Sequence, residues 1–309
     1  MSPQPSVVLG TRGSNLALAQ AETCAARLRE LGLDVEVRII KTTSERHPET
    51  PFSVLDQRDV FTRQLDEALL AGDIDLAIHS LKDVPTDPPE GIVLAAITER
   101  HDPSDALVSE AGYTVEDLPD EAIVATSSLR RRAQLLHHRP GLRIVGIRGN
   151  VETRIRKVRE GAADALVLAR AGLDRLGLEA AHTVISPEVM LPAVGQGALA
   201  AATLEDHPQR DEIHAALDHE PSSRATRAER AMLRTLEGGC RVPVGALGAA
   251  EDGVDVRLRG IVVSPDGALV YGGEAKGSSP EEVGDRLARE LLEQGASVVL
   301  GEVRQMRNS

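Results

Sequence analysis

Apolar runs and helically spaced apolar residues alternate along the first two thirds of the chain, and they do so twice in the same order. Residues 7–9 predict a strand, and Ser14 is typical of the residue that begins a helix. Residues 123–124 predict a second such strand, which is followed by Ser128 and another helical pattern. The repetition indicates two copies of one strand–helix arrangement.

Each copy continues with matching segments. Second strands are predicted at residues 35–40 and 142–147. Residues 72–78 and 161–167 each contain a glycine that ends a helix, an aspartate and a buried strand. Alternating strands and helices predict a mostly parallel sheet in each copy. We therefore expect two similar α/β domains with a cleft between them; chance similarity between short α/β segments is the alternative.

The last third of the chain has a different pattern. Residues 253–261 alternate between apolar and polar, 264–267 predict a turn, and 268–271 predict a returning strand. Ser279 and Pro280 then begin a helix with one apolar face. This pattern predicts a small α+β domain with an antiparallel sheet.

Two links that contain proline or glycine, residues 99–103 and 191–197, are expected to carry the chain between the two α/β domains and back. They set the predicted domain boundaries. These are 1–99 with 198–219 for the first domain, 100–197 for the second, and 220–309 for the C-terminal domain.

Composition limits the classes of function. Aromatic residues make up 1% of the 309 residues and the net charge is −13, so neither base stacking nor general polyanion binding is expected. The N-terminus has no signal-peptide pattern and no run has the length of a membrane helix. The two cysteines lie in different contexts and do not suggest a disulfide framework. We expect a cytoplasmic protein that binds neither nucleic acid nor membrane.

The two cysteines have different predicted roles. Cys24 lies on the apolar face of a predicted helix and is expected in the core. Cys240 follows two glycines that end another helix, and Arg241 is its neighbour. Nearby positive charge favours the nucleophilic thiolate. Cys240 is therefore a candidate for covalent or redox chemistry.

Arginine far outnumbers lysine and is concentrated in one region of this acidic chain. Codon bias accounts for most of the excess of arginine over lysine. The concentration of arginines in one region suggests a small polyanionic ligand, because guanidinium groups bind carboxylates in bidentate geometry. The concentrated arginines are Arg130, Arg131, Arg132, Arg143, Arg148, Arg154, Arg156 and Arg159.

Residues 79–83 form a polar cluster directly after a predicted buried strand. Asp83 at this strand end can act as an acid or base, or can cap the next turn. No histidine or cysteine spacing predicts a metal site, and no phosphate-binding or dinucleotide-binding glycine motif is present.

Seven motifs occur in an order that resembles the porphobilinogen deaminase family. They cover the chain from about residue 7 to 245. The motifs are GTRGSNLA (10–17), DLAIHSLKDVP (75–85), TSSLRR (126–131), RGNVETR (148–154), AGLDRLG (171–177), LPAVGQGA (191–198) and GGC (238–240).

The resemblance implies a fold and a reaction. It implies three domains, the first two like periplasmic binding proteins. It implies a transferase of porphyrin and heme biosynthesis that joins four porphobilinogen molecules head to tail, releases four ammonia molecules and yields hydroxymethylbilane. It also implies a dipyrromethane cofactor attached to Cys240 by a thioether, a monomeric enzyme, and uroporphyrinogen-III synthase as acceptor of the product.

The resemblance also assigns roles to residues. Asp83 is implied as the catalytic group that stabilises a cationic intermediate and contacts pyrrole NH groups. Cofactor contacts are implied for Ser80, Lys82, Asp83, Thr126, Ser127, Ser128, Arg130 and Arg131. Substrate contacts are implied for Arg12, Ser14, Arg58, Phe61, Arg148, Arg154, Arg175 and Gln196.

The chain departs from the family pattern at residues 57–59, which read Gln-Arg-Asp where the family usually has Gly-Lys-Gly. Residues 43–59 are expected to form a loop that covers the cleft, with Arg58 in place of lysine. Two alternatives stay open at this point. One is a two-lobed protein that binds a small dicarboxylate without catalysis, and the other is a catalytically impaired relative of the deaminase.

Overall fold

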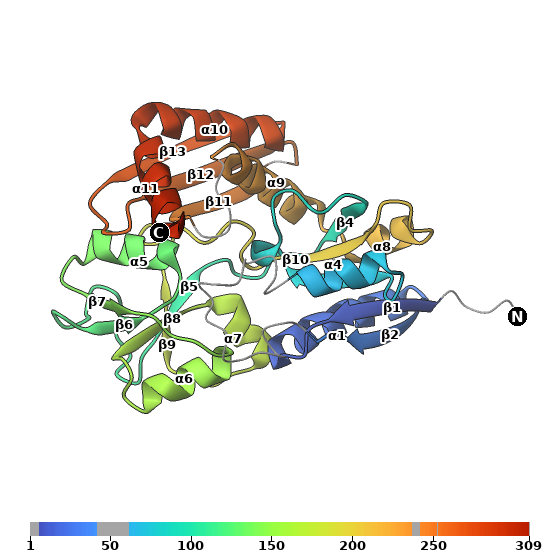
Figure 1. The fold of residues 1–309 in the computed structure, drawn as a ribbon, viewed down its shortest axis with the longest axis horizontal. Helices are drawn as coiled ribbons and strands as arrows, with labels where there is room; N and C mark the ends of the chain where they lie inside the picture. Colours follow the sequence, from blue (N-terminus) through green and yellow to red (C-terminus); the bar gives the residue numbers. More distant parts are fainter. Residues whose placement is uncertain (1–5, 42–61, 237–241, 252, 309) are drawn as a thin grey trace, which may run out of the picture. The chain divides into compact units, whose positions relative to one another are not determined.

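The computed structural model describes residues 6–41, 62–236, 242–251 and 253–308 (Figure 1). The chain divides into two compact units. One comprises Met1–Arg100 with Ala198–Ser223, and the other His101–Gly197 with Arg224–Ser309. The sequence predicted three domains, whereas this division gives two units, so the predicted domain boundaries stay a prediction.

The first unit contains a five-stranded sheet in the order β2-β1-β3-β10-β4. Strand β1 is parallel to β2 and β3, whereas β10 is antiparallel to β3 and β4. Helices α1 and α8 pack on one face of the sheet, and α4 packs on the other. The elements are β1 (Ser6–Thr11), α1 (Asn15–Glu30), β2 (Asp34–Ile39), α4 (Arg63–Leu70), β3 (Leu76–Ser80), the 3-10 turn Leu81–Asp83, β4 (Ile92–Ile97), β10 (Leu199–Leu204) and α8 (Arg210–Leu217).

The second unit repeats this topology in the order β7-β6-β8-β5-β9. Strand β6 is parallel to β7 and β8, and β5 is antiparallel to β8 and β9. The elements are β5 (Asp105–Val108), β6 (Ile123–Ala125), α5 (Leu129–His138), β7 (Arg143–Val145), α6 (Val151–Arg159), β8 (Ala165–Ala169), α7 (Arg170–Leu176) and β9 (His182–Ile185). The predicted internal repeat is thus confirmed in the strand order.

Two aspartates show how closely the copies correspond. The backbone N–H of Val8 donates to Asp75 Oδ2 at 2.7 Å, and that of Ile123 donates to Asp164 Oδ2 at 2.7 Å. In return, each aspartate N–H donates to the carbonyl oxygen of the same strand residue, at 2.8 Å and 2.9 Å. Each aspartate therefore fixes the start of the first strand of its copy against the third.

The prediction of mostly parallel sheets was wrong in one respect. Half of the strand pairings in each α/β sheet are antiparallel, and β10 and β5 are responsible for all of them. Each of these strands enters its sheet directly after the chain has crossed from the other α/β copy. A strand that arrives in this way has no βαβ connection to its neighbours, so the rule for parallel pairing does not apply to it.

Local predictions hold at the helix ends and in the cores. Ser14 Oγ accepts a hydrogen bond from the N–H of Ala17 at 3.3 Å, and Ser128 Oγ accepts one from that of Arg131 at 3.4 Å. Both serines are therefore helix N-caps, as predicted. Cys24 is buried among aliphatic side chains in the first unit, which confirms its core position.

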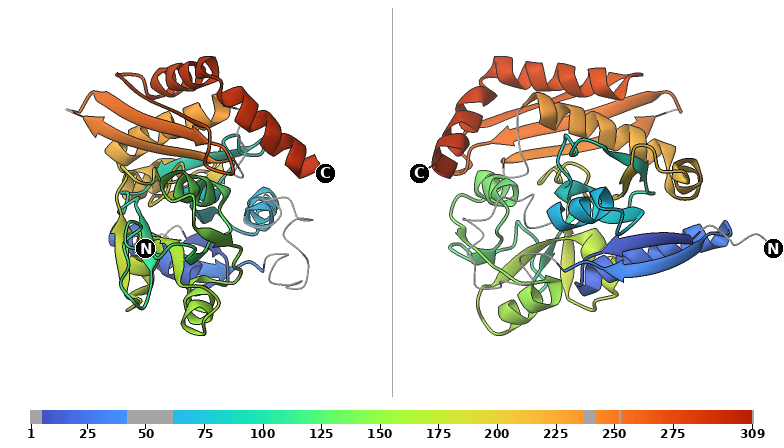
Figure 2. Two further views of the ribbon diagram at one scale, coloured as in Figure 1. Left: turned by 90° about the vertical axis from the view of Figure 1, so that its left-hand side faces the viewer. Right: turned by 45° about the vertical axis from the view of Figure 1, so that its right-hand side comes forward.

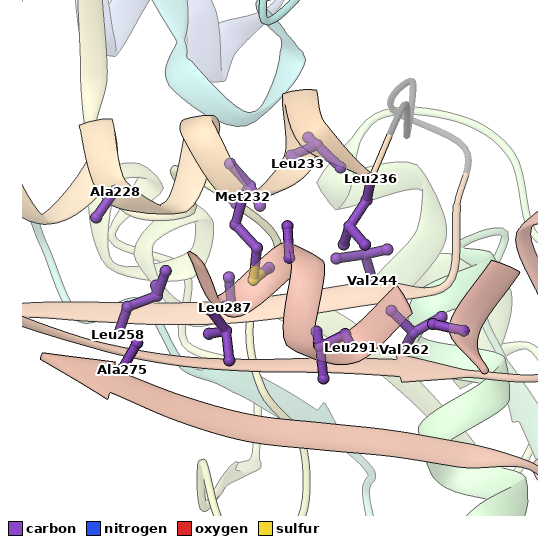
Figure 3. Packing of buried hydrophobic residues seen from close by; sticks show 14 of the residues in the cluster. Ala228, Met232, Leu233, Leu236, Val244, Leu258, Val262, Ala275, Leu287 and Leu291 are labelled. Carbon is purple, nitrogen blue, oxygen red and sulfur yellow. The ribbon is translucent and has the colours of Figure 1, made fainter. Parts of the chain in front are cut away.

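The C-terminal part of the second unit contains an antiparallel sheet in the order β11-β12-β13. Side chains from α9, α10 and α11 pack with those of the sheet into one aliphatic core (Figure 3). Strand β11 and helix α11 were not among the sequence predictions. The elements are α9 (Glu220–Thr235), within which the division into units falls, β11 (Val244–Glu251), β12 (Asp255–Val263), β13 (Val270–Gly277), α10 (Pro280–Gln294) and α11 (Ala296–Asn308).

Two glycines shape this C-terminal part. Gly295 ends α10 in the left-handed conformation with φ 115°, and α11 then runs at a steep angle to α10 (Figure 2). Gly284 lies where α10 approaches α9 most closely, because a Cβ atom there would overlap the carbonyl oxygen of Ala228 and lie 2.7 Å from Ala231 Cβ. The two helices can pack at this distance only with glycine at 284.

We predict that Gly284→Ala lowers the free energy of unfolding by about 1–3 kcal/mol, the usual cost of overpacking. The matched control is Gly301→Ala in α11, where a Cβ atom meets nothing within 4 Å. That substitution should raise stability by up to about 1 kcal/mol through helix propensity. Urea unfolding of both variants tests the packing, and equal effects would contradict it.

Candidate active site

The first unit places polar side chains at one edge of its sheet. Strands β1 and β3 are parallel neighbours, with Gly10 opposite Ala77, so the segments that follow them leave the sheet at the same edge. Arg12 and Ser14 follow β1, and the turn Leu81–Asp83 follows β3. Open α/β sheets bind ligands at this edge of their parallel strands.

The turn after β3 presents three of the predicted site residues. Ser80 Oγ accepts a hydrogen bond from Gln20 Nε2 at 3.0 Å, which ties the strand end to α1. Lys82 and Asp83 are half-buried, and the N–H of Val84 donates to the Leu81 carbonyl at 3.1 Å to close the turn. The Asp83 carboxyl group is therefore held on a short hydrogen-bonded turn.

His79 precedes these residues and is buried. Burial and the positive charge of Arg12 lower the pKa of His79 from its usual value of 6.5 to about 4. The imidazole is consequently neutral near pH 7 and adds no positive charge to the site.

The corresponding edge in the second unit carries the segment 126–128. Ser127 Oγ donates to the carbonyl oxygen of Ile147 at 2.7 Å and accepts from its N–H at 3.0 Å. Thr126 Oγ1 accepts from the N–H of Ser128 at 3.2 Å. Ser127 therefore links the end of β6 to the segment after β7, which leads to Arg148.

A pocket of about 550 Å³ lies beside this segment, and its lining includes Ser127, Arg148 and Lys157. Lys157 Nζ donates to the carbonyl oxygen of Arg148 at 3.1 Å. Arg154 Nε donates to that of Gly149 at 2.7 Å. The pocket thus has two cationic side chains in its wall, as a site for carboxylates requires. Lys157 was not predicted, because a single lysine in a helix carries no sequence signal.

Arg130 and Arg131 are buried rather than directed to solvent, with exposed fractions of 4% and 7%. Asp105, with 0% exposure, pairs with both: its Oδ2 lies 2.8 Å from Arg130 Nη1, and its Oδ1 accepts from Arg131 Nε and Nη2 at 3.1 Å and 2.8 Å. Arg130 also donates to the carbonyl oxygen of Leu191 and Arg131 to that of Val167. These contacts fix both guanidinium groups inside the second unit.

The charges of this cluster determine its protonation. Burial alone raises the pKa of Asp105, but attraction to Arg130 and Arg131 outweighs it and holds the pKa well below its usual range. Burial lowers the pKa of Arg130, and Asp105 opposes that change. Asp105 is therefore a carboxylate near pH 7. The sequence predictions missed it, because an aspartate before an apolar run resembles any strand-end residue.

Two further predicted residues, Gln196 and Arg175, contact or lie in the link that carries the chain back to the first unit. We call residues 191–197 the return link and residues 99–103 the outward link. Gln196 is buried, and its Nε2 donates to Asp105 Oδ1 at 2.9 Å and to the Pro103 carbonyl oxygen at 2.7 Å. Arg175 Nη2 donates to the carbonyl oxygen of Gly197 at 2.6 Å. Gln196 therefore joins the cluster of Asp105, while Arg175 supports the end of the same link from α7.

Some predicted residues cannot be placed. Cys240, Arg58 and Phe61 lie outside the described residues, as does the whole of the predicted cover loop, residues 43–59. Within the part of the chain that the structure describes, no group of three or more histidine, cysteine, aspartate or glutamate residues could hold a metal ion. Of the described helices, none is both long and apolar enough to span a bilayer.

The pKa of His79 leads to a prediction about stability. Between pH 6.5 and about 4 the unfolded chain binds a proton at this histidine that the folded chain does not, so stability falls as the pH is lowered through that window. The loss amounts to about 3 kcal/mol at the acid end. Thermal unfolding from pH 7 to 4 should show a weaker pH dependence in His79→Gln than in wild type. His101→Gln, at an exposed position, is the control. Identical slopes for His79→Gln and wild type would refute the assignment.

Comparison with known proteins identifies the family. A family model described as "Porphobilinogen deaminase, dipyromethane cofactor binding domain" matches residues 7–212, and one for the C-terminal domain of porphobilinogen deaminase matches residues 224–293. A porphobilinogen deaminase of Rubrobacter xylanophilus is 67% identical over 298 residues, which cover 96% of this chain and 97% of that protein. One of Desulforudis audaxviator is 47% identical over 303 residues, covering 96% of this chain and 98% of that protein.

Among solved structures, a periplasmic substrate-binding protein of an ABC transporter from Coxiella burnetii is similar with a TM-score of 0.42 and 17% identity, over 72% of this chain and 96% of that one. The sequence matches are far more specific, since they span both α/β copies and the C-terminal part. The chain belongs to the porphobilinogen deaminase family.

Proposed function

We propose that this protein is a hydroxymethylbilane synthase. It condenses four porphobilinogen molecules head to tail, with release of four ammonia molecules, on a dipyrromethane primer bound to Cys240. The observation that carries this proposal is the match of residues 7–212 to the cofactor-binding domain of the family. The 67% identity to a porphobilinogen deaminase over almost the whole chain supports it.

The charges at the two sheet edges fit this group of ligands. Each pyrrole unit of the cofactor and the growing chain carries two carboxylates, so the site has to supply several cations. Arg12 lies at the sheet edge of the first unit, and Arg148 and Lys157 line the pocket of the second. Arginine and lysine bind carboxylates through charge-assisted hydrogen bonds, which are about twice as strong as neutral ones. The residues present are therefore compatible with a dipyrromethane.

The bound dipyrromethane supplies the nucleophilic pyrrole carbon to which the first substrate is joined. The protein has to bind the incoming pyrrole, orient it and stabilise the positive charge that develops as ammonia leaves. Asp83 is suited to this last role, because its carboxyl group is half-buried and lies on a short turn at the sheet edge. A carboxylate in such a position accepts hydrogen bonds from pyrrole N–H groups and attracts the developing cation.

The proposal also covers the compartment of the enzyme, its oligomeric state and the acceptor of its product. It acts as a cytoplasmic monomer and releases its product to a uroporphyrinogen-III synthase. The resemblance to the family supports these points, and the different sequence contexts of the two cysteines support a reducing compartment. Light scattering of the purified protein tests the monomer.

Intact-mass measurement tests the proposed cofactor attachment. The purified chain should exceed its sequence mass by two linked pyrrole units, and it should react with an aldehyde reagent for pyrroles. Cys240→Ser should lose both properties. Cys24→Ser is the matched control and should keep them, because that thiol is buried in the first unit. An active wild-type protein without the adduct, or an adduct on Cys24, would refute the attachment.

Replacement of Asp83 by Asn tests its chemical role. Asp83→Asn keeps the shape of the side chain but removes its charge, so turnover of porphobilinogen should fall by about 10²–10⁴ with little change in thermal stability. Asp87→Asn, four residues further along and exposed, is the control and should stay near the wild-type rate. Early melting of Asp83→Asn with near-normal turnover would show that Asp83 only caps the turn.

A further inference from the structure

The cluster of Asp105, Arg130 and Arg131 has an unbalanced charge. Two buried guanidinium groups face a single carboxylate, and among the described residues no other acidic side chain forms an ion pair with either arginine. The nearby Asp102 pairs instead with Arg170, at 2.6 Å. Within the part of the chain that the structure describes, one positive charge of the cluster therefore has no counterion, and burial of an unbalanced charge is costly.

The hydrogen bonds of the cluster are also unequally shared. Arg131 donates from Nε and Nη2 to Asp105 Oδ1, and from Nη1 to the Val167 carbonyl oxygen. Arg130 Nη1 donates to the Leu191 carbonyl oxygen and lies 2.8 Å from Asp105 Oδ2 as an ion pair, while the buried Arg130 Nε makes no hydrogen bond within the described residues. The N–H at Arg130 Nε therefore belongs to the same cluster in which two guanidinium groups share one carboxylate.

We propose that Asp105 is a positioning residue that orients Arg130 and Arg131 so that the pair takes one further carboxylate, from the cofactor or the growing pyrrole chain. This inference rests on the proposed function. One carboxylate from a ligand would make the cluster neutral. Asp105 thus sets both the orientation of the arginines and the number of anionic groups that they accept.

Asp105 is suited to this role because it also joins the two links of the chain. Its Oδ1 accepts from Gln196 Nε2 on the return link, and the same Nε2 donates to Pro103 on the outward link. The backbone of the two links is paired as well, since the N–H of His101 donates to the carbonyl oxygen of Gly197 at 3.2 Å. The arginine pair is therefore held in a fixed position relative to both links.

An uncharged amide cannot replace the carboxylate. In Asp105→Asn, the side-chain NH₂ group would face at least one guanidinium N–H, so that two donors would meet. The buried positive charge would also rise from one to two. Loss of the single acid from such a cluster leaves its partners uncompensated, and this is the costly way to break a buried ion pair.

The first test compares Asp105→Asn with Asp102→Asn in the full-length enzyme. Asp102 is the matched control, because it pairs with one arginine and its side chain is 34% exposed. Intact mass of the folded, purified proteins gives the fraction that carries the dipyrromethane. We expect this fraction to fall at least about tenfold in Asp105→Asn and to stay near wild type in Asp102→Asn. Full occupancy in Asp105→Asn would overturn the proposal.

Asp105→Glu tests positioning even if the Asn variant does not fold, because it keeps the charge. The longer side chain should shift the guanidinium groups, and misplacement of binding groups should raise the KM for porphobilinogen on the order of tenfold. The melting temperature should stay close to that of wild type. A lowered melting temperature with an unchanged KM would show a structural role only.

Chemical rescue separates charge from shape. Asp105→Ala leaves space between two guanidinium groups, and formate should restore turnover several-fold whereas the uncharged formamide should not. Equal rescue by both would contradict the proposal. A wild-type protein without pyrrole adduct or turnover would instead refute the proposed function. A loaded, active wild type beside a fully loaded Asp105→Asn would refute the role of Asp105 alone.

Discussion

Both α/β sheets depend on a strand that the chain supplies only after it has crossed from the other copy. Strand β5 lies between β8 and β9, and β10 lies between β3 and β4. Neither sheet has its full set of strands until the corresponding link has been made, so the links are anchored at their ends by buried strands. The return link, residues 191–197, is buried except for the partly exposed Ala193 and includes the polar Gln196, whereas residues 99–103 of the outward link are partly or fully exposed.

Buried polar groups along the return link have to be satisfied, and a buried carboxylate does part of this. Glu229 of α9 is fully buried and accepts hydrogen bonds from the N–H groups of Gly195 and Gly248, both at 2.7 Å. It thereby joins the return link to the C-terminal sheet within the second unit. Asp105, which follows the outward link, accepts instead from a side chain of the return link, that of Gln196. An unpaired backbone N–H in the same place would be costly, which explains why acids are found in such apolar surroundings.

The sequence predicted what is decided locally. Caps such as Ser14 and the apolar helix face with Cys24 depend on neighbours within a few residues. Asp75 and Asp164 were noticed only as members of a repeated pattern, and their bonds to strand residues 67 and 41 positions away were not predicted. Strand β10 was not predicted, because its alanines have a low intrinsic strand preference and only their burial between β3 and β4 makes the strand. The ion pairs of Asp105 escaped prediction for a similar reason, since its partners lie 25 and 26 residues away along the chain.

In the arginine-rich region, the density of charged residues along the sequence does not show where their charges lie in the folded protein. Arg132 donates to the Pro265 carbonyl oxygen, and Arg159 to Glu110, so that helices α5 and α6 send part of this charge to the surface. Arg130 and Arg131, on the opposite side of α5, are buried against one carboxylate. Arg148 lines the pocket at the sheet edge. An arginine contributes to anion binding only where the fold leaves its charge unbalanced by its own neighbours, and that condition is set by helix periodicity and strand ends rather than by arginine density.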